Sequence, residues 1–405
     1  MEETKNKISY KFSSLEKFYR EINPNVTIEA NGLLYFNSND ELLDNAFPQM
    51  LNDVYQNTSS VHSNFINLKR NMIYSEGFKP ISGNNSTDLQ KFILHENKVG
   101  DNLNDILMKA SLDMAIHEAI AIEVLYNSEG KIADIYHIDV SNIRAEKPDE
   151  FGIVNCFYLS TKWAKITNKV NRRNTITTAA TKLPRFNPAT WEEDGGIQLY
   201  YINRYTSGQE VYSIPSYVSI LNYANLQNEI GKFELNKLEK GMLASGMLVI
   251  PGDPSEEQKN SFINNMEKKY IGSTGNKVIY SWKPEDSTNK PEWIPLETED
   301  KSSNNAISLL NDMASQSIAT GHGGSLTLAG IEGKGADLGG DSNKLLSSLG
   351  FYQKNIIRPM QTTILNGFNK ILAVNELGKI EIPYVPLIVE STSIVPIKNN
   401  ISKQK

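Results

Sequence analysis

Residues 215–243 read PSYVSILNYANLQNEIGKFELNKLEKGML, and they follow the pattern of a long amphipathic helix. Charges alternate in sign along the second part of this stretch, from Glu229 to Lys240. A helix of this length would extend for roughly 40 Å. Because its apolar residues lie on one side, the helix needs a partner surface. The residues of this stripe are Tyr217, Leu221, Tyr223, Ala224, Ile230, Phe233, Leu238 and Met242.

A small β-α-β-β module follows the long helix. Its helix start is the sequence DPSE at 253–256, where aspartate is the N-cap, proline takes the first helical position and glutamate the third. Glycine and asparagine residues after the helix favour a turn before the next strand. The predicted elements are strands at 247–250, 277–282 and 293–296 and a helix from 254 to 270.

Two further long helices and a glycine-dense segment complete the second half. Residues 302–320 carry apolar residues at helical spacing, and a similar pattern runs from about Ser342 to 375. Pro359 lies inside the later pattern, and because proline removes one backbone donor we expect a kink there. Between the two helices, residues 321–340 contain eight glycines, which predicts a loop.

The first half of the chain predicts an α+β unit. The turn sequence NSEG at 127–130 separates two runs of β-forming residues, which indicates a hairpin. The predicted elements are helices at 61–74 and 102–119, hairpin strands at 121–126 and 132–138, and more strands between 151 and 201. The fold class is therefore α+β, with long helices around a small inserted module in the second half.

The composition is that of a folded protein that is neither disordered nor membrane-embedded. The 405 residues are 39% hydrophobic and 22% charged, and no apolar run approaches the roughly 18 residues that span a bilayer. Residues 1–10 lack the apolar core of a secretion signal. The single cysteine, Cys156, forms no intrachain disulfide, which favours a cytosolic place of assembly. The net charge of −6 is unlike that of free nucleic-acid binders, which carry a basic face.

In order and in sequence, these blocks resemble the portal proteins of tailed bacteriophages, also called head-tail connectors. The strongest similarity runs from IPSY at 214–217 through Phe233 to SGML at 245–248. It departs from the family where Gly241 stands without the asparagine that commonly precedes it. The resemblance covers residues 50–375, and the other blocks that carry it are 59–78, 109–144, 255–258, 275–278 and IIRPMQ at 356–361.

The resemblance implies a portal-protein fold whose parts have set places in that family. A wing faces the capsid, two stem helices carry a clip between them, and a tunnel loop approaches the DNA. The implied parts are an α+β wing (1–213), a first stem helix (214–243), the clip (244–298), a second stem helix (299–320), the tunnel loop (321–340), a kinked long helix (341–375) and a C-terminal strand and tail (376–405) with a minimal or absent crown.

The same resemblance implies a structural channel and not an enzyme. About twelve copies would close into a ring at one capsid vertex, and double-stranded DNA would be packaged and ejected through it. The implied partners are the major capsid and scaffolding proteins, the terminase large subunit that drives packaging, and a head-completion or adaptor protein. No membrane partner and no cofactor are implied. The protein would belong to the virion after assembly in the host cytoplasm.

An acidic balance suits a channel in which DNA must slide, because every added cation strengthens phosphate binding steeply. We expect Glu299, Asp300 and Asp312 to contribute to the channel wall. Glycines permit large backbone movements, so the tunnel loop could follow the grooves of passing DNA; the alternative is a flexible loop without a function. The DNA-facing candidates in this loop are Ser325, Leu326, Thr327, Leu328, Ile331, Glu332, Lys334 and Asp337.

A basic run in the first half has two interpretations. Residues 162–185 contain seven lysines and arginines and no acidic residue. This run is either a docking patch for nucleic acid or for an acidic capsid or scaffold surface, or a solvated loop of the wing. The turn-like sequence ITTAAT at 176–181 favours the solvated loop. The docking-patch candidates are Lys162, Lys165, Lys169, Arg172 and Arg173.

Nucleotide-binding and zinc motifs are incomplete. A Walker motif needs a glycine where Leu328 stands, and Gly335 follows Lys334 in place of serine or threonine. His117 begins a zinc-protease-like pattern, but Ala121 takes the place of the second ligand. We therefore expect Asp113 and His117, one helical turn apart, to form a satisfied structural pair.

The remaining chemistry is equally sparse. Cys156 has no neighbouring cysteine and is expected to pack within a strand. We predict no catalytic residue and no metal ligand. The second candidate function is another ring-forming head or connector protein of a phage, and the third is an enzyme such as a nuclease with a helical arm.

Overall fold

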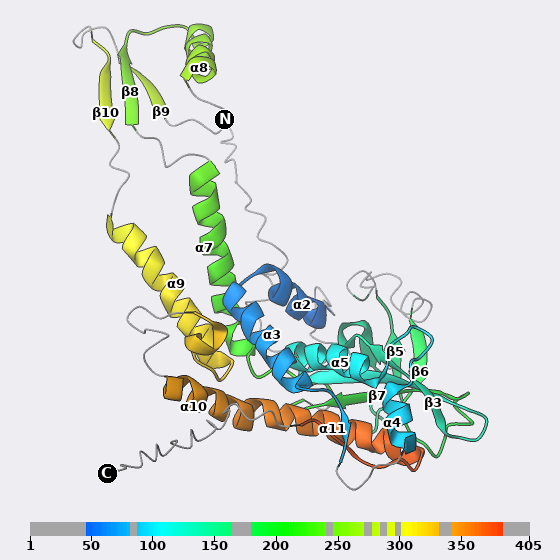
Figure 1. Cartoon of the computed structure of the whole chain (residues 1–405). Helices are drawn as coiled ribbons and strands as arrows, with labels where there is room; N and C mark the ends of the chain where they lie inside the picture. The colour runs from blue at the N-terminus through cyan, green and yellow to red at the C-terminus, as the bar shows by residue number, and fades with distance from the viewer. Residues whose placement is uncertain are drawn as a thin grey trace, which may run out of the picture. The chain divides into compact units, whose positions relative to one another are not determined.

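The computed structural model describes residues 46–81, 87–161, 163, 180–209, 211–239, 246–270, 278–283, 290–295, 301–331 and 342–383. They belong to two compact units. Unit 1 is built from Asp53–Ser63 and Tyr217–His322, and unit 2 from Asn64–Ser216 with the described residues up to Asn52 and from Gly323 onward. Within the described residues the chain passes from unit 2 to unit 1 inside α2 (Phe47–Asn57) and back to unit 2 inside α3 (Ser60–Tyr74); both helices are labelled in Figure 1.

Unit 2 combines helices with antiparallel sheets, so the expected mixture of helix and sheet is confirmed. Its strands form the sheets β3-β2-β7, β4-β5-β6 and β1-β11. In chain order its elements are β1 (Lys79–Pro80), α4 (Thr87–Leu94), α5 (Leu103–His117), β2 (Ala119–Tyr126), β3 (Ile132–Ile138), η1 (Val140–Asn142), β4 (Ile143–Ala145), β5 (Cys156–Leu159), β6 (Thr181–Pro184), β7 (Ile197–Asn203), η4 (Leu326–Ala329), α10 (Ser342–Tyr352), η5 (Gln353–Ile357), α11 (Arg358–Val374) and β11 (Ile380–Glu381).

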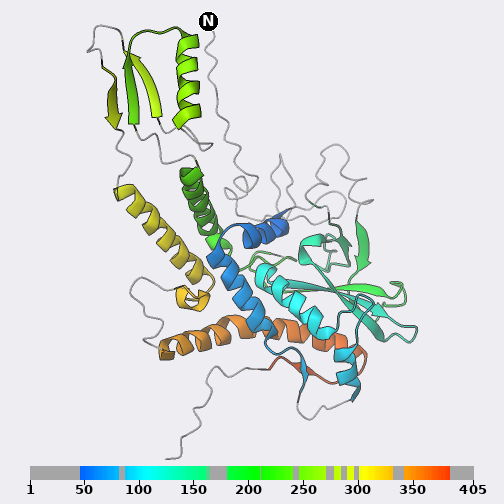
Figure 2. The same cartoon turned by 45° about the horizontal axis from the view of Figure 1, so that its top comes forward.

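The hairpin of β2 and β3 forms as the turn sequence predicts. Asn127 Oδ1 accepts hydrogen bonds from the backbone N–H groups of Glu129 and Lys131 at 2.9 and 3.0 Å, and Gly130 takes a positive φ of 75°. Strand β2 is central, since it pairs antiparallel with both β3 and β7. Its first four residues are buried, and α5 packs on the sheet (Figure 2). A continuous apolar run such as AIAI is therefore the expected sequence for this strand.

Helix α5 has defined signals at both ends. Asn102 caps its start, and Asp105 returns a bond to the Asn102 backbone, which completes a capping box. At its end Glu118 adopts the left-handed conformation, with φ of 51°. The buried Glu118 carboxylate accepts hydrogen bonds from Arg204 Nη1 at 3.0 Å and from the backbone N and Oγ of Ser216 at 2.9 and 2.6 Å. These bonds tie the end of α5 to the last residue of unit 2 before the chain enters unit 1.

The sheet β4-β5-β6 contains the single cysteine. Cys156 lies in β5 and is buried, so its prediction as a packed strand residue is confirmed. Burial raises the pKa of its thiol to about 12. In β4 of this sheet, the buried Arg144 side chain donates to the carbonyls of Ser141 and Ile143 at 2.9 and 2.6 Å and lies over the Trp163 ring. The positive charge of Arg144 is thus held by backbone dipoles and an aromatic face.

Unit 1 contains two long helices and a small module. The helix predicted at 215–243 begins with the turn η3 (Val218–Ile220) and continues as α7 (Leu221–Glu239). It packs against α9 (Lys301–Gly321), and Gln227 of α7 donates to Asn311 and Ser315 of α9 at 3.2 and 2.7 Å. These side-chain bonds fix the two helices side by side (Figure 1).

The predicted β-α-β-β module is confirmed as β8 (Gly246–Pro251), α8 (Glu256–Tyr270), β9 (Val278–Lys283) and β10 (Glu292–Pro295). The helix starts later than predicted, because Ser255 and not Asp253 is its N-cap: the Gln258 N–H donates to Ser255 Oγ at 3.4 Å, and the Ser255 N–H donates to Gln258 Oε1 at 3.1 Å. Strand β8 is central, parallel to β9 and antiparallel to β10. Helix α8 packs on one sheet face, where Phe262 meets the Tyr280 ring edge-on at 5.9 Å and Lys259 lies over Trp282 (Figure 2).

The kink expected at Pro359 takes the form of a π-helical turn. Helices α10 and α11 are joined by η5, in which Arg358 N–H donates to Gln353 O, five residues earlier. Pro359 lies in the first turn of α11, where a missing N–H leaves no intrahelical bond unmade. The extra residue of the π turn accommodates the proline ring, and the two helices run on end to end (Figure 1).

Lys69 of α3 provides a test of the buried polar centre around Glu118. Lys69 is 1% exposed. Burial lowers its pKa to about 8; the nearby Glu118 charge acts to raise this pKa, and the Arg204 charge acts to lower it. The unfolded chain therefore binds more protons between pH 8 and 10.5, so the folded state gains stability as the pH rises through this window. Between pH 7.5 and 9.5 we expect the wild type to gain roughly 2 kcal/mol relative to Lys69→Met.

Denaturant unfolding at the two pH values measures this difference. Lys98→Met, which removes an exposed lysine of the same unit, is the control and should follow the wild type at both pH values. A constant difference between wild type and Lys69→Met across the window would show that Lys69 does not lose its proton on folding.

Candidate functional site

The α7 and α9 helices bury part of their apolar surface and expose the rest. In α9, Ala314 and Ile318 are buried, whereas Leu309, Leu310 and Met313 are exposed. We call these three residues the α9 apolar row. Because Leu309 and Met313 are four residues apart, they lie on the same face of the helix.

Helix α7 shows the same division. Leu221 and Ala224 are buried, and Tyr223, Phe233 and Leu235 are exposed. We call Tyr223 and Phe233 the α7 apolar row, because Leu235, two residues after Phe233, lies on another face of the helix. The sequence pattern alone assigns Tyr223 and Phe233 to the covered stripe, so one chain covers less of the stripe than expected. Exposed apolar side chains that gather on neighbouring helices are typical of a protein-protein interface.

The acidic channel candidates are only partly within the described residues. Asp312 lies on α9 and is exposed, one turn from Leu309 of the α9 apolar row. Glu299 and Asp300 lie outside the described residues. Asp312 is thus the described carboxylate on which the acidic-wall prediction depends.

The first part of the glycine-dense segment is ordered, unlike the predicted loop. Gly321 belongs to α9, and residues 326–329 form the 3₁₀ turn η4, which packs on α10. Gly330 ends the turn with φ of 73°, and its N–H donates to the Leu326 and Thr327 carbonyls. Asn64 Nδ2 donates to Ala329 O at 3.4 Å. The half-buried side chains here are Ser325, Leu326, Thr327, Leu328 and Ile331.

Close packing explains two glycines of this segment. A Cβ at Gly323 would lie 2.8 Å from Ile356 Cδ1, and Gly323 has φ of 74°. A Cβ at Gly324 would lie 2.6 Å from Phe65 Cε1. These two glycines therefore serve backbone geometry and close approach to neighbouring side chains. Glu332, Lys334 and Asp337 lie outside the described residues.

Buried polar atoms surround the joint between η4 and the π turn. Phe65, which contacts the Gly324 backbone, also lies 6.4 Å from the Tyr352 ring. Within the described part of the chain, Ser325 Oγ, Tyr352 O–H and Gln353 Oε1 are buried and have no hydrogen-bond partner. Burial also raises the pKa of Tyr352, because the phenolate cannot be solvated there. Unsatisfied groups at a π turn make this joint less rigidly bonded than the helices on either side.

The docking-patch candidates Lys162, Lys165, Lys169, Arg172 and Arg173 lie outside the described residues. Of the same basic run, Lys182 is described, and its Nζ donates to Glu146 Oε1 at 3.2 Å and lies over the Tyr158 ring. This lysine is thus engaged within its own sheet.

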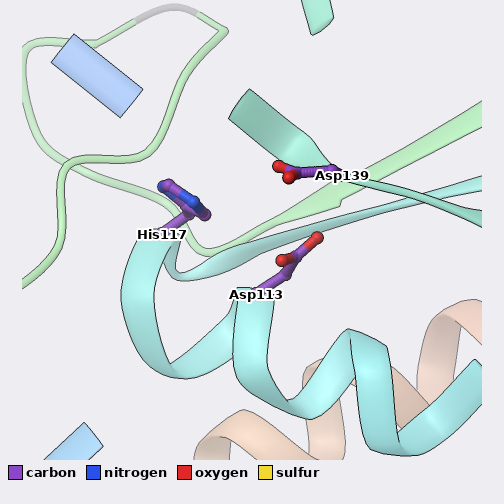
Figure 3. A group of neighbouring side chains, drawn as sticks. All are labelled: Asp113, His117 and Asp139. Carbon is purple, nitrogen blue, oxygen red and sulfur yellow. The ribbon is translucent and has the colours of Figure 1, made fainter. Parts of the chain in front are cut away.

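A buried cluster joins the end of α5 to the segment after β3. Asp113 and His117 share it with Asp139, and the three side chains face one another (Figure 3). Asp113 Oδ2 accepts from His137 Nε2 at 2.9 Å and from the Val140 N–H at 3.2 Å. Both residues are buried, but each forms its hydrogen bonds with other residues, His117 with Asn52, so the expected pairing of Asp113 with His117 is not found.

The spacing in the sequence predicts that Asp113 and His117 lie close together, but it does not predict that Asp139 joins them. Helical periodicity relates residues on one helix, and Asp139 comes from another element. The hairpin brings Asp139 back to α5, because β3 is antiparallel to β2 and β2 follows α5 directly. The signal of Asp139 in the sequence is the turn start at Asp139-Val140-Ser141, which indicates a cap and not a cluster.

No family model matches the sequence, and no curated protein matches it. Among solved structures, a chain of the virion of the native gene transfer agent particle covers 82% of this chain and 82% of its own length, with a TM-score of 0.56 and 12% identity. A chain from the neck of the native particle, with C12 symmetry, covers 80% of this chain and 79% of its own, with a TM-score of 0.52 and 12% identity.

A phage portal protein of the HK97 family from Corynebacterium diphtheriae is also similar, at a TM-score of 0.45 and 9% identity over 79% of this chain and 91% of that chain. The matches to the virion and neck chains establish a shared fold, and the likeness expected from the sequence is confirmed at that level. No helix among the described residues is both long enough and apolar enough to cross a membrane.

Two glycine variants test the packing of the η4 segment. Gly323 and Gly330 both have a positive φ, but only Gly323 would bring a Cβ against another side chain. We expect Gly323→Ala to lower the free energy of unfolding by about 2–4 kcal/mol, from backbone strain and overpacking together. Gly330→Ala should cost about 1 kcal/mol from the backbone alone. Equal losses in thermal or denaturant unfolding would contradict the close approach of Gly323 to Ile356.

Proposed function

We propose that this chain is a portal protein, one subunit of a ring at a capsid vertex through which double-stranded DNA is packaged and ejected. The observation that carries the proposal is the fold shared with chains of the gene transfer agent virion and neck over most of both lengths. The sequence blocks resembling the portal family support it independently. The proposed role is structural, and we propose that the terminase large subunit drives DNA packaging.

The parts then take the family's roles. Unit 2 holds most of the wing, α7 and α9 are the stem helices, and the β8-α8-β9-β10 module is the clip. The helix α10-η5-α11 is the long helix that returns into the wing. The tunnel loop is the segment 321–340, to which Lys334 and Asp337 belong.

Ring closure gives the apolar rows a partner. A head-to-tail contact, repeated around an axis, sets one surface of a subunit against a different surface of the next. The α9 apolar row of one subunit would pack on the α7 apolar row of its neighbour, which removes both from water. The matched neck of the native gene transfer agent particle was computed with C12 symmetry and that of the empty particle with C6 symmetry, and about twelve copies are proposed here.

DNA would pass along a wall with little positive charge. Each chain has a net charge of −6, and Asp312 on α9 is exposed. A wall without clustered cations releases few counterions on contact, so it does not hold the backbone. Glu299 and Asp300 would extend the same acidic surface toward the clip.

The partners follow from the places of these parts. The clip would meet the terminase large subunit during packaging and the head-completion or adaptor protein afterwards. The wing would meet the major capsid and scaffolding proteins, and the basic run with Lys162 and Arg172 is a candidate docking patch there. Assembly would take place in the host cytoplasm, and the ring would end in the virion.

A second candidate is another ring-forming head or connector protein, because two of the matched structures are particle necks. Immunogold labelling of empty heads without tails separates the two. A portal is present at one vertex before the neck is complete, whereas a later connector is absent from such heads.

The ring interface can be tested with a matched pair of variants. Leu309 of the α9 apolar row and Leu94 of α4 are both 60% exposed. Leu309→Asp places a charge in the proposed interface and should shift the protein from rings to monomers. Leu94→Asp adds the same charge elsewhere and should leave the rings intact. Negative-stain electron microscopy and sedimentation velocity measure both, and rings formed by Leu309→Asp as readily as by Leu94→Asp would exclude this interface.

The tunnel loop can be tested without disturbing η4. Deleting residues 332–338 removes Glu332, Lys334 and Asp337 but keeps the ordered turn at 326–329. We expect rings of normal size and a several-fold loss of DNA packaged or retained per head, measured by nuclease protection. Normal filling of heads by this variant would show that the loop takes no part in DNA handling.

A further inference from the structure

We propose that Asp113, His117 and Asp139 bind one divalent transition-metal cation, with the donor set of one imidazole nitrogen and two carboxylate oxygens. This site is separate from the apolar rows and the tunnel loop, and it does not depend on the proposed portal function. Its role would be structural, because the ion would join the end of α5 to the segment that follows β3.

The three ligand atoms lie at nearly the required separation. They are all within 4.8 Å of one another, and the side chains face a common space (Figure 3). With metal-ligand distances of about 2.1 Å, two ligands on opposite sides of an ion are about 4.2 Å apart. Small side-chain rotations therefore suffice to close the site.

Hydrogen bonding prepares His117 as a ligand. Its Nε2 lies 3.0 Å from Asn52 Oδ1, a carbonyl oxygen that only accepts, so Nε2 carries the proton. The neutral ring then presents an unprotonated Nδ1. A histidine ligand fixed through its second nitrogen is the usual arrangement at metal sites.

Each of the two carboxylates is also held by hydrogen bonds through one of its oxygens. Asp113 uses Oδ2 for the His137 and Val140 bonds, and Asp139 uses one oxygen, Oδ1, for the Ser141 N–H at 2.7 Å. Each aspartate keeps its other oxygen for a ligand. These second bonds hold the carboxylates in place and would survive metal binding.

The free atoms of the cluster are all acceptors. Within the described part of the chain, no hydrogen bond joins His117 Nδ1, Asp113 Oδ1 or Asp139 Oδ2 to a donor. Asp113 and His117 are 7% and 4% exposed, so bulk water solvates them little. Two carboxylate oxygens and a nitrogen lone pair repel one another unless a positive charge lies between them. A divalent cation offsets both carboxylate charges and satisfies all three lone pairs.

The donor set selects the class of ion. Imidazole nitrogen suits Zn²⁺, Fe²⁺ and Ni²⁺, and carboxylate oxygens suit Mn²⁺, whereas Ca²⁺ and Mg²⁺ take oxygen ligands. Three protein ligands leave at least one position for water. Zn²⁺ and Mn²⁺ are therefore the appropriate probes, and Mg²⁺ is the comparison ion.

The test begins with the full chain, stripped by EDTA and dialysed. Titration with ZnCl₂ or MnCl₂ in a calorimeter should give one ion per chain, and at a free concentration 100 times the Kd the melting temperature should rise by about 5 °C. Mg²⁺ at equal concentration should produce a much smaller rise.

Asp139→Asn removes a charged ligand but retains the Oδ1 acceptor that caps η1, so this variant should fold and melt like the metal-free wild type. Its response to Zn²⁺ should be lost. Asp134→Asn is the matched control, because Asp134 is also a half-buried aspartate of this hairpin that bonds a histidine, His95. This variant should bind Zn²⁺ as the wild type does.

Mn²⁺ provides a spectroscopic readout of the nitrogen ligand. The electron spin-echo signal of bound Mn²⁺ should carry the modulation of one imidazole nitrogen, and His117→Gln should abolish that modulation. The proposal is overturned if the wild type binds neither ion stoichiometrically, or if Asp139→Asn and Asp134→Asn respond equally to Zn²⁺. Ring formation by the wild type and these variants is measured separately. The absence of metal binding would therefore leave the portal proposal unaffected.

Discussion

Unit 1 depends on the inability of two helices to cover their own apolar surface. Helices α7 and α9 extend for about 28 and 32 Å, and each carries apolar residues on more than one face. Helices α7 and α9 pack against each other, and Ala224, Ala314 and Ile318 are buried. The larger Phe233, Leu309 and Met313 remain exposed. A protein that keeps such rows exposed as a single chain gains stability when copies associate, and this relates the packing to the proposed ring.

Elements with local signals can be predicted from the sequence, whereas elements set by distant contacts cannot. The β8-α8-β9-β10 module follows from a cap and proline at its helix start, and the β2-β3 hairpin from a turn that Asn127 closes within five residues. The turn η4 escapes prediction because glycines indicate a loop when read locally. At positions 323 and 324 glycine is needed because the side chains of Ile356 and Phe65 lie too close for a Cβ atom. These contacts come from distant parts of the sequence, so no local pattern reveals them. Helix α4 escapes prediction because its eight residues make little more than two turns, although Leu89 and Ile93 lie four residues apart on its buried face.

The same limit applies to the polar residues. Asp113 and His117 stand out in the sequence because they are one helical turn apart, and their structural role could be expected. Asp139 and Asn52 reach the same place from other elements, so a cluster of this kind becomes visible only in the folded chain. The DNA-facing candidates could be named only through family position, since a residue that meets a partner along a channel leaves no spacing rule within one chain.

The end of α5 connects these observations. His117 bonds Asn52 through its ring, and its carbonyl accepts from Ser213; the next residue, Glu118, holds Arg204 and Ser216. Glu118 is held in a left-handed conformation that a non-glycine residue adopts at a cost of about 1–2 kcal/mol. That cost is offset by three charge-assisted bonds, which anchor the residue directly before the chain enters unit 1. Under the proposed portal function, this anchor would lie where the chain passes from the proposed wing to the first proposed stem helix.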